Sequence, residues 1–321
     1  MKIVSRWVFV AGALIGAGAV GAQNYPTRAV RLIVPSSPGG GTDITARIIA
    51  PDLSKLLGQQ VVVENRPGAG TMIGGEAVAK AAPDGYTLLM GVSTLAINPA
   101  IYKKVPYDAL RDFAPITQAV SLPNVIVGHP SLPARNVKEL VALARARPGA
   151  LNFSSAGVGT SPHLSVELFL VMTKTKMLHI PYKGSGPAAT DLIAGQVQLM
   201  APNMLTAYPH IKTGRMRAYG VTTLKRAAGA PEIPTIAEAG VPGYEAVQWY
   251  GVLAPADTPR PIVTRLHGEI VKVLQQSSVK ELLGRDGAEP VGNTPEEFAA
   301  FITAETVKWA KVVKEAGIPP E

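Results

Sequence analysis

The sequence contains no cysteine among its 321 residues, and this absence excludes several kinds of site. Disulfide frameworks, zinc–thiolate sites, iron–sulfur clusters and cysteine nucleophiles all require thiols. Aromatic residues make up only 6% of the chain, so few nucleic-acid bases could be stacked, although the formal net charge is +8. Hydrophobic residues amount to 47%, which suffices for a buried core, and the length corresponds to about two domains of ~150 residues each.

Long hydrophobic runs are also scarce: the one present, Trp7 to Val20, has 14 residues and falls short of the ~20 that span a bilayer. Lys2 and Arg6 are basic residues that precede or open this run, and small residues at Val20 and Ala22 fit a cleavage site. The pattern favours a signal peptide over residues 1–22 rather than a membrane anchor. It predicts export to the periplasm, and removal of the two basic residues lowers the net charge from +8 to +6.

The motifs of the common catalytic and cofactor sites are absent. No G-x-S-x-G elbow, H-E-x-x-H pair or G-x-x-x-x-G-K-[ST] loop occurs in the chain, and none of its glycine-rich loops between an expected strand and an expected helix has the G-x-G-x-x-G fingerprint. We therefore expect no catalytic residues, no metal and no cofactor.

Short apolar runs alternate with amphipathic segments, which predicts an α/β fold with largely parallel sheets. A helix follows residues 41–43, and Pro51 is expected to kink or split it. Capping boxes at Asn136 and Thr294 predict helices beginning at those residues. The expected strands are Val30–Val34, Val61–Val63, Tyr86–Met90, Val125–Gly128, Leu151–Ser154, Leu178–Tyr182, Val197–Met200 and Arg217–Val221.

Three glycine-rich loops each connect an expected strand to an expected helix. They span residues 35–43, 154–163 and 182–187. Loops of this kind lie at the carboxyl ends of strands, where ligands of α/β sheets bind, and helix N-termini attract anions. Because the nucleotide motifs are missing, the sequence favours a carboxylate over a polyphosphate.

Each loop also has a simpler interpretation as a strand-to-helix turn with a capping side chain. Asp43 could be the N-cap of the first helix, and Arg47 a solvated charge. His163 could be a buried structural histidine instead of a ligand contact, and the same choice is open for Tyr182 and Asn203.

Several segments, in this order and spacing, resemble the Bug/TctC family of periplasmic solute receptors of tripartite tricarboxylate transporters. The resemblance covers essentially the whole chain after residue 22. It rests on the 35–43 loop, Glu64-Asn65-Arg66-Pro67-Gly68-Ala69-Gly70, Pro83-Asp84-Gly85-Tyr86-Thr87-Leu88, Asn98-Pro99, Pro106-Tyr107-Asp108, the 154–163 loop, Pro181-Tyr182-Lys183-Gly184, Pro234-Thr235-Ile236-Ala237-Glu238-Ala239-Gly240 and Thr294-Pro295-Glu296-Glu297-Phe298.

The resemblance implies a type II periplasmic-binding-protein (Venus flytrap) fold, in which two α/β lobes enclose a cleft. We expect lobe one to comprise residues 23–122 and 221–321, and lobe two residues 123–220. The implied function is binding of a small organic carboxylate for delivery to a tripartite tricarboxylate transporter, by a monomer that binds no nucleic acid. The implied ligand-binding residues are Ser37, Gly40, Gly41, Asp43, Thr94, Ser155, Gly157, Thr160, Ser161, His163, Tyr182, Lys183, Gly184 and Asn203.

Two features depart from the family pattern. Many relatives carry Phe-Asp-Asn-Leu where this chain has Ala201-Pro202-Asn203-Met204, which argues against an amino-acid ligand. Ser36-Ser37 replaces a commoner aromatic-plus-small pair, which would widen the site. A receptor that serves a sensor kinase, and a secreted hydrolase or lyase on the same scaffold, are the alternatives.

Overall fold

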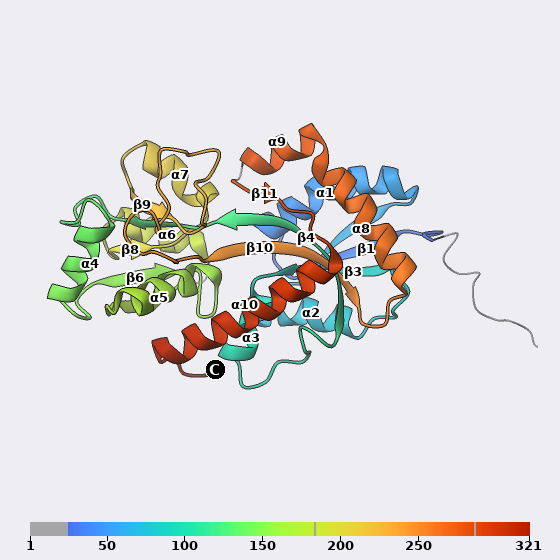
Figure 1. Cartoon of the computed structure of the whole chain (residues 1–321), viewed down its shortest axis with the longest axis horizontal. Coiled ribbons are helices and arrows are strands. Elements are labelled where there is room, and N and C mark those ends of the chain that lie inside the picture. Colours follow the sequence, from blue (N-terminus) through green and yellow to red (C-terminus); the bar gives the residue numbers. More distant parts are fainter. Residues whose placement is uncertain (1–24, 183, 286) are drawn as a thin grey trace, which may run out of the picture.

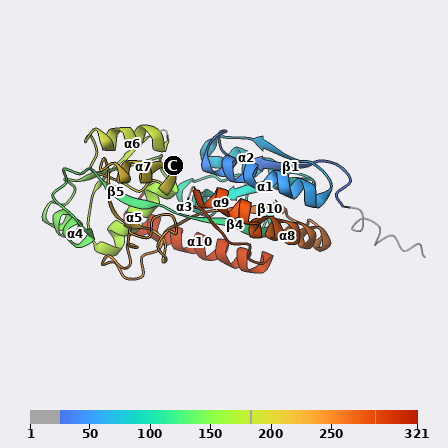
Figure 2. The same cartoon turned by 90° about the horizontal axis from the view of Figure 1, so that it is seen from above.

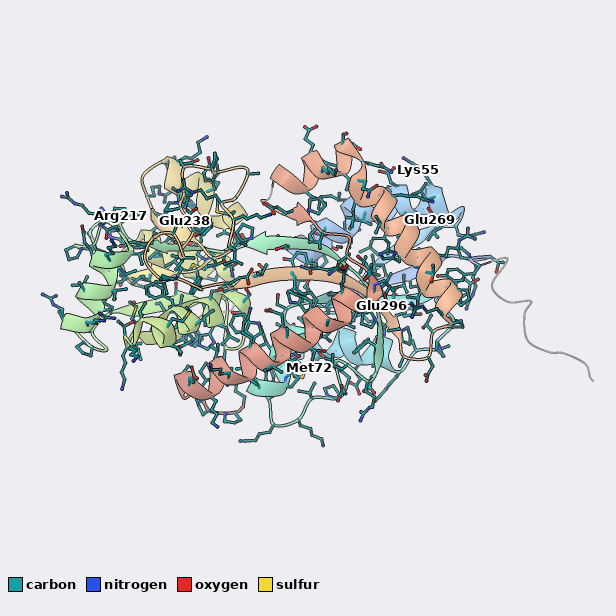
Figure 3. The ribbon with its side chains drawn as sticks, viewed as in Figure 1. Lys55, Met72, Arg217, Glu238, Glu269 and Glu296 are labelled. Atoms are coloured by element: carbon teal, nitrogen blue, oxygen red, sulfur yellow. The ribbon has the colours of Figure 1, made fainter. Side chains whose placement is uncertain are left out.

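The computed structural model describes residues 25–182, 184–285 and 287–321, which form two lobes placed end to end (Figures 1 and 2). The expected signal peptide, residues 1–22, lies outside the described residues. Among the residues described, no helix has the length and apolar character needed to cross a membrane. In Figure 3, Lys55, Met72 and Glu296 lie in the first lobe and Arg217 and Glu238 in the second.

Lobe one is built on a six-stranded sheet with the strand order β11-β4-β10-β3-β1-β2. The strands β1, β2 and β3 are parallel, whereas β4, β10 and β11 pair in antiparallel fashion. The bounds are β1 Val30–Val34, β2 Val61–Asn65, β3 Thr87–Val92, β4 Phe113–Pro123, β10 Val247–Pro255 and β11 Glu289–Pro290.

Helices cover both faces of this sheet because successive strand residues point to opposite sides. Leu32 packs in one apolar cluster with α1, α8 and α9, and Ile33 in another with α2, α3 and the first half of α10. The helices are α1 Gly41–Leu57, α2 Met72–Ala79, α3 Thr94–Ile101, α8 Arg260–Gln275, α9 Ser277–Arg285 and α10 Pro295–Ala316, and a 3₁₀ turn, η1, covers Ala69–Thr71.

Lobe two has a five-stranded sheet with the order β7-β6-β8-β5-β9 and the same layered plan. The strands β6, β7 and β8 are parallel, and β5 and β9 are antiparallel neighbours. Arg217 of β9 donates hydrogen bonds to three carbonyls in the turn after β5. The bounds are β5 Val125–Gly128, β6 Asn152–Ser155, β7 Leu178–Pro181, β8 Leu199–Met200, β9 Arg217–Val221, α4 Val137–Ala146, α5 Ser161–Thr173, α6 Ser185–Ile193 and α7 Met204–Lys212.

The lobes are joined where the long strands β4 and β10 run toward lobe two (Figure 1). Asn124 lies between β4 and β5, and it exchanges main-chain and side-chain hydrogen bonds with Thr222 just after β9. Helix α10 passes beneath both lobes: Phe298 packs in lobe one, whereas Trp309 packs against the core of lobe two. Several residues between 236 and 246, which follow β9 in the chain, also pack in the lobe-two core. The lobe boundaries at 122/123 and 220/221 stay a prediction.

The sequence predicted the helix starts better than the strand directions. Asn136 and Thr294 cap α4 and α10, and the box of Thr294 and Glu297 is complete. The prediction of largely parallel sheets was wrong, because the strands beside the lobe connection are antiparallel. Pro51 does not split α1, since it lies on the exposed side, where water can bind the carbonyl it leaves without a donor.

Candidate functional site

Three helices begin directly after the glycine-rich loops, and none of them has a side-chain cap. The helix α1 starts after Gly40, α5 after Thr160 and α6 after Gly184. Side chains cap α4, α7 and α10, whereas α2, α3 and α8 also begin without a side-chain cap. Because the first-turn N–H groups of a helix lack intrahelical acceptors, the three loop helices retain main-chain donors with a partial positive charge. The expected capping side chain is therefore absent at these three helix starts.

Asp43 is not the N-cap of α1, because it stands three residues inside the helix, after Gly40. Its buried carboxylate accepts hydrogen bonds from the Gly39 N–H (2.9 Å), Asn65 Nδ2 (2.9 Å) and Arg47 Nε (3.0 Å). Burial opposes ionisation of Asp43, but these hydrogen bonds outweigh it and lower the pKa. Asp43 thus holds the first loop in place, and its oxygens are already engaged.

Asn65 is a residue that the reasoning from individual residues did not select. Its amide also donates to the carbonyl of Ser36 at 3.0 Å, so it ties both ends of the first loop to the end of β2. The parallel register of β1 and β2, which places Val34 beside Asn65, brings it there. The only sequence signal was its place in the family motif.

The remaining predicted residues of lobe one lie near this loop or at the start of α3. Ser37 and Gly40 are exposed, and Gly41 is partly buried below the hydroxyl of Tyr250. Thr94 opens α3, and its hydroxyl lies 2.6 Å from that of Thr71, a residue with a left-handed φ of 76°.

The second loop is closed by hydrogen bonds among its own residues. The Ser155 hydroxyl accepts from the Gly157 N–H at 3.1 Å, and Thr160 Oγ1 donates to the Gly157 carbonyl at 2.7 Å. Gly157 and Gly159 have φ values of +137° and +71°, which L-residues rarely adopt. The local fold therefore requires glycine at both positions.

His163 and Ser161 of α5 face inward rather than outward. His163 is 2% exposed, and its Nδ1 accepts from the Gly159 N–H at 3.1 Å. Ser161 Oγ accepts from Asn124 Nδ2 at 2.8 Å. Asn124, which sequence reasoning missed, also donates to Ser165, and its Oδ1 has no partner among the described residues.

The last predicted site residues lie in the third loop and at the start of α7. The Tyr182 hydroxyl donates to Asp191 at 2.6 Å, and this hydrogen bond raises the Tyr182 pKa. The Gly184 N–H donates to the carbonyl of Ala156, so the second and third loops are joined. Asn203 Oδ1 caps α7 by accepting from the Thr206 N–H at 2.9 Å. Lys183 lies outside the described residues.

The structure thus groups the lobe-two residues of the second and third loops, and separately groups Ser37, Gly40, Gly41 and Asp43 in lobe one. Most of the predicted polar side chains hold these loops, whereas the helix N-termini keep their main-chain donors. An uncapped N-terminus suits an oxyanion, because its N–H groups replace the water lost by the anion.

Comparison with known proteins shows which family and fold the chain resembles. Residues 45–318 match the model of the tripartite tricarboxylate transporter family receptor, TctC. Protein BugT of Bordetella pertussis is 41% identical over 312 residues, which cover 97% of this chain and 95% of BugT.

Two solved structures from Rhodopseudomonas palustris have the same fold. Rpa4515 with adipate is 40% identical with a TM-score of 0.82, covering 92% of this chain and 100% of that one. MatC with bound malate is 32% identical with a TM-score of 0.76, covering 90% and 100%. These matches confirm the expected type II periplasmic-binding-protein fold with two lobes, and the chain belongs to the TctC family of tripartite tricarboxylate transporter receptors.

Proposed function

We propose that this protein is a periplasmic receptor that binds a small organic carboxylate between its lobes and delivers it to a tripartite tricarboxylate transporter. The observation that carries the proposal is the absence of side-chain caps at the starts of α1, α5 and α6, the helices that follow the three glycine-rich loops. The similar proteins described with adipate and with malate support a carboxylate ligand.

In this proposal, main-chain donors bind the ligand and side chains shape the loops. The first turn of α1, from Gly41, and the exposed Ser37 contact a carboxylate from lobe one. The first turns of α5 and α6 contact it from lobe two, with Tyr182 beside them, and Lys183 is a further candidate contact. Thr94 and Asn203 contact the rest of the ligand, and Asn203 Nδ2, the atom of this amide that does not cap α7, donates to it. Burial of an oxyanion is favourable only when donors replace its water shell, and helix N-termini do this without a second charge.

Lobe closure would couple binding to recognition by the transporter. A ligand that contacts both lobes stabilises the closed form by the contacts made only in that form. The lobe connection at Asn124 and Thr222 is the hinge in this proposal, because the two connecting segments are hydrogen-bonded to each other there.

Isothermal titration calorimetry with dicarboxylates tests the binding step. We expect adipate or malate, or another diacid of a panel from four to eight carbons, to bind the wild type, and the diamide of the same acid not to bind. Thermal shift gives an independent readout, since a ligand at 100 times its Kd stabilises the folded state by ~2.7 kcal/mol. Absence of binding and of any thermal shift across the panel would contradict the proposal.

Location and delivery need their own experiments. We expect the mature chain to begin at Gln23 in a periplasmic extract, which N-terminal mass spectrometry can determine. Cross-linking of the ligand-loaded protein in membranes should capture transporter subunits. Capture of a sensor kinase instead would support the alternative partner.

A further inference from the structure

Behind the second loop lies a stack of three rings that the proposed ligand contacts do not include. The imidazoles of His163 and His179 are stacked with their centroids 3.8 Å apart and their planes at 14°. Phe153 stacks on His179 at 4.9 Å. His163 belongs to α5, His179 to β7 and Phe153 to β6, so the stack joins three elements of lobe two.

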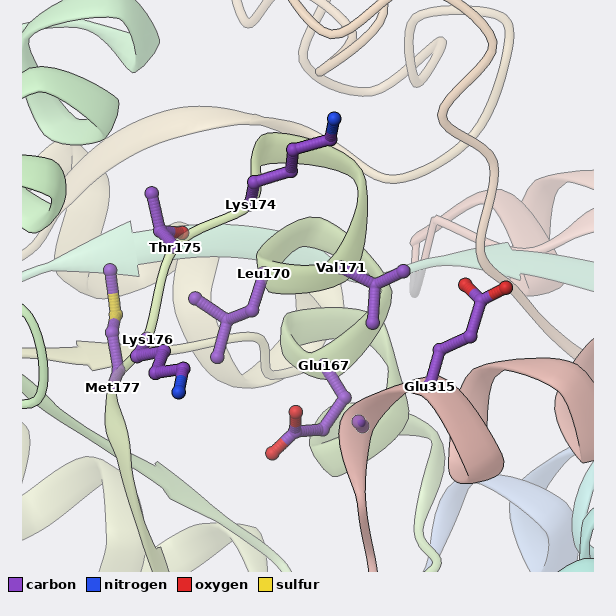
Figure 4. A pocket seen from close by; sticks show the side chains of 9 residues that line it. Glu167, Leu170, Val171, Lys174, Thr175, Lys176, Met177 and Glu315 are labelled. Atoms are coloured by element: carbon purple, nitrogen blue, oxygen red, sulfur yellow. The ribbon is translucent and has the colours of Figure 1, made fainter.

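His163 holds Gly159 directly. Its Nδ1 accepts the hydrogen bond of the Gly159 N–H, so the ring proton must reside on Nε2. That nitrogen lies 3.5 Å from Glu167 Oε1, one helical turn farther along α5. Glu167 lines an outer groove of about 610 Å³ between α5 and the end of α10, together with Lys176 and Glu315 (Figure 4). The Glu167 carboxylate thus favours the proton on His163 Nε2, the ring nitrogen that faces away from Gly159.

His179 holds Gly157 through Ser155. Its Nε2 lies 2.7 Å from Ser155 Oγ, which also accepts from the Gly157 N–H and donates to the Gly157 carbonyl. A hydroxyl has one proton and two lone pairs, so all three partners are satisfied when His179 Nε2 carries a proton. Burial, and to a lesser degree the neighbouring His163, lowers the pKa of His179 to about 3, so the ring is neutral at neutral pH.

The two glycine amides of the loop are therefore occupied by the protein. The Gly157 N–H donates to Ser155 Oγ and the Gly159 N–H to His163 Nδ1, so neither serves as a ligand donor. In the first turn of α5, the N–H groups of Ser161 and His163 have no intrahelical acceptor. The shape of the loop decides where these two donors point.

We propose that His163 and His179 are positioning residues that together fix the Gly157–Gly159 loop, so that the N–H groups of Ser161 and His163 are presented to the ligand carboxylate. This inference rests on the proposed function. In this proposal the ring of His163 holds the loop and does not contact the ligand, whereas the main-chain N–H of His163 does.

Paired substitutions at the two rings test the proposal by calorimetry on the full mature chain with adipate and malate. His163→Leu and His179→Leu keep an apolar volume and remove the hydrogen bonds, and we expect the Kd to rise at least about tenfold. His163→Asn places an amide oxygen where Nδ1 was, and His179→Gln places an amide nitrogen where Nε2 was. Each should restore the Kd to within about threefold of the wild type.

His210→Leu, in the last turn of α7 and outside the stack, is the control and should leave both affinity and melting temperature close to wild type. A merely structural role would lower the melting temperature of the leucine variants and leave the Kd of the folded fraction unchanged, which would overturn the proposal. Equal weakening by His163→Leu and His163→Asn would overturn it as well.

Two measurements on the wild type do not depend on the variants folding. Nitrogen-15 spectra of the histidine rings should show the Nε2–H tautomer at both His163 and His179, and the amides of Gly157 and Gly159 should exchange slowly without ligand. An Nδ1–H tautomer at His163, or fast exchange of both amides, would overturn the assignment. If the wild type binds no acid while these two results hold, the proposed function fails and the loop geometry stands.

Discussion

The hydroxyl oxygen of Tyr250 stands 2.7 Å from the position that a β-carbon on Gly41 would occupy. The ring carbons nearest to that position are 3.6 and 3.7 Å away, which is ordinary contact. Gly41 is the first residue of α1, so the side chain of a core strand limits what can stand at the start of this helix. The constraint concerns a single oxygen atom, which also accepts a hydrogen bond from Gln248 Nε2 at 3.2 Å.

We expect Gly41→Ala to displace the first turn of α1 and to weaken carboxylate binding at least about tenfold, because the new methyl group collides with the hydroxyl. Tyr250→Phe in the same chain should recover most of the affinity, since only ordinary contacts remain. Calorimetry on the two single variants and the double variant measures this. Gly268→Ala in α8 is the matched control, because a methyl group there would meet no atom within 4 Å and the residue lies outside the proposed binding site.

Asp43→Ala should lower both stability and ligand affinity. It leaves the Gly39 N–H and the Asn65 amide without their acceptor, which costs ~1–3 kcal/mol of the free energy of unfolding. Urea denaturation and calorimetry give the two quantities. Asp52→Asn, in the same helix, removes only a surface pair with Lys55 and should change stability by less than ~0.5 kcal/mol. Equal effects of the two variants would contradict the role of Asp43.

Asn124→Ala should weaken binding as well as stability. Its side chain is fully buried between the lobes and donates to Ser161 and Ser165 of α5, so its loss costs ~1–3 kcal/mol and frees the start of that helix. Asn136→Ala removes the cap of α4, which costs ~1 kcal/mol. That control should destabilise the protein without changing the Kd. If Asn124→Ala leaves the Kd unchanged, Asn124 does not link the hinge to ligand binding.

The depressed pKa of His179 predicts a loss of stability in mild acid. The unfolded chain takes up a proton near the usual 6.5, whereas the folded state stays neutral down to about 3. Between these values the unfolded state binds more protons, so the free energy of unfolding falls as the pH falls, by up to ~1.4 kcal/mol per pH unit. Urea denaturation at pH 7.5 and 5.5 measures the slope, above the range in which carboxylates titrate.

His179→Gln should flatten this dependence, because glutamine does not titrate. His210→Gln should leave the wild-type slope in place. If His179→Gln retains the full slope, another group is responsible and the burial of His179 does not control the acid sensitivity.

Sequence reasoning located the elements whose signals are local. The strands Val30–Val34, Val125–Gly128 and Arg217–Val221 were predicted with the bounds observed, since each is a short run in which apolar residues predominate. Caps such as Thr294 with Glu297 were found because a capping box is complete within four residues.

The long strands β4 and β10, which lead to the lobe connection, were not predicted. Both are buried on both faces over most of their length, so the polar–apolar alternation of an exposed strand is missing. Pro115 lies inside β4, where a proline argues against a strand, but it sits at an irregularity in the pairing with Leu253 of β10. Because β4 and β10 pair in antiparallel fashion with each other and with their neighbours, the sheet of lobe one is mixed and not largely parallel.

The sequence by itself determined the family, the glycine loops and the helix starts, because these depend on residues close together in the chain. Tertiary structure alone decided the roles within the site. The pairing of β1 with β2 brings Asn65 to Asp43, and the pairing of β6 with β7 places His179 beside Phe153 and against His163. Contacts between residues 16 or more positions apart depend on strand register, which is set by how whole sheets pack and not by any local pattern.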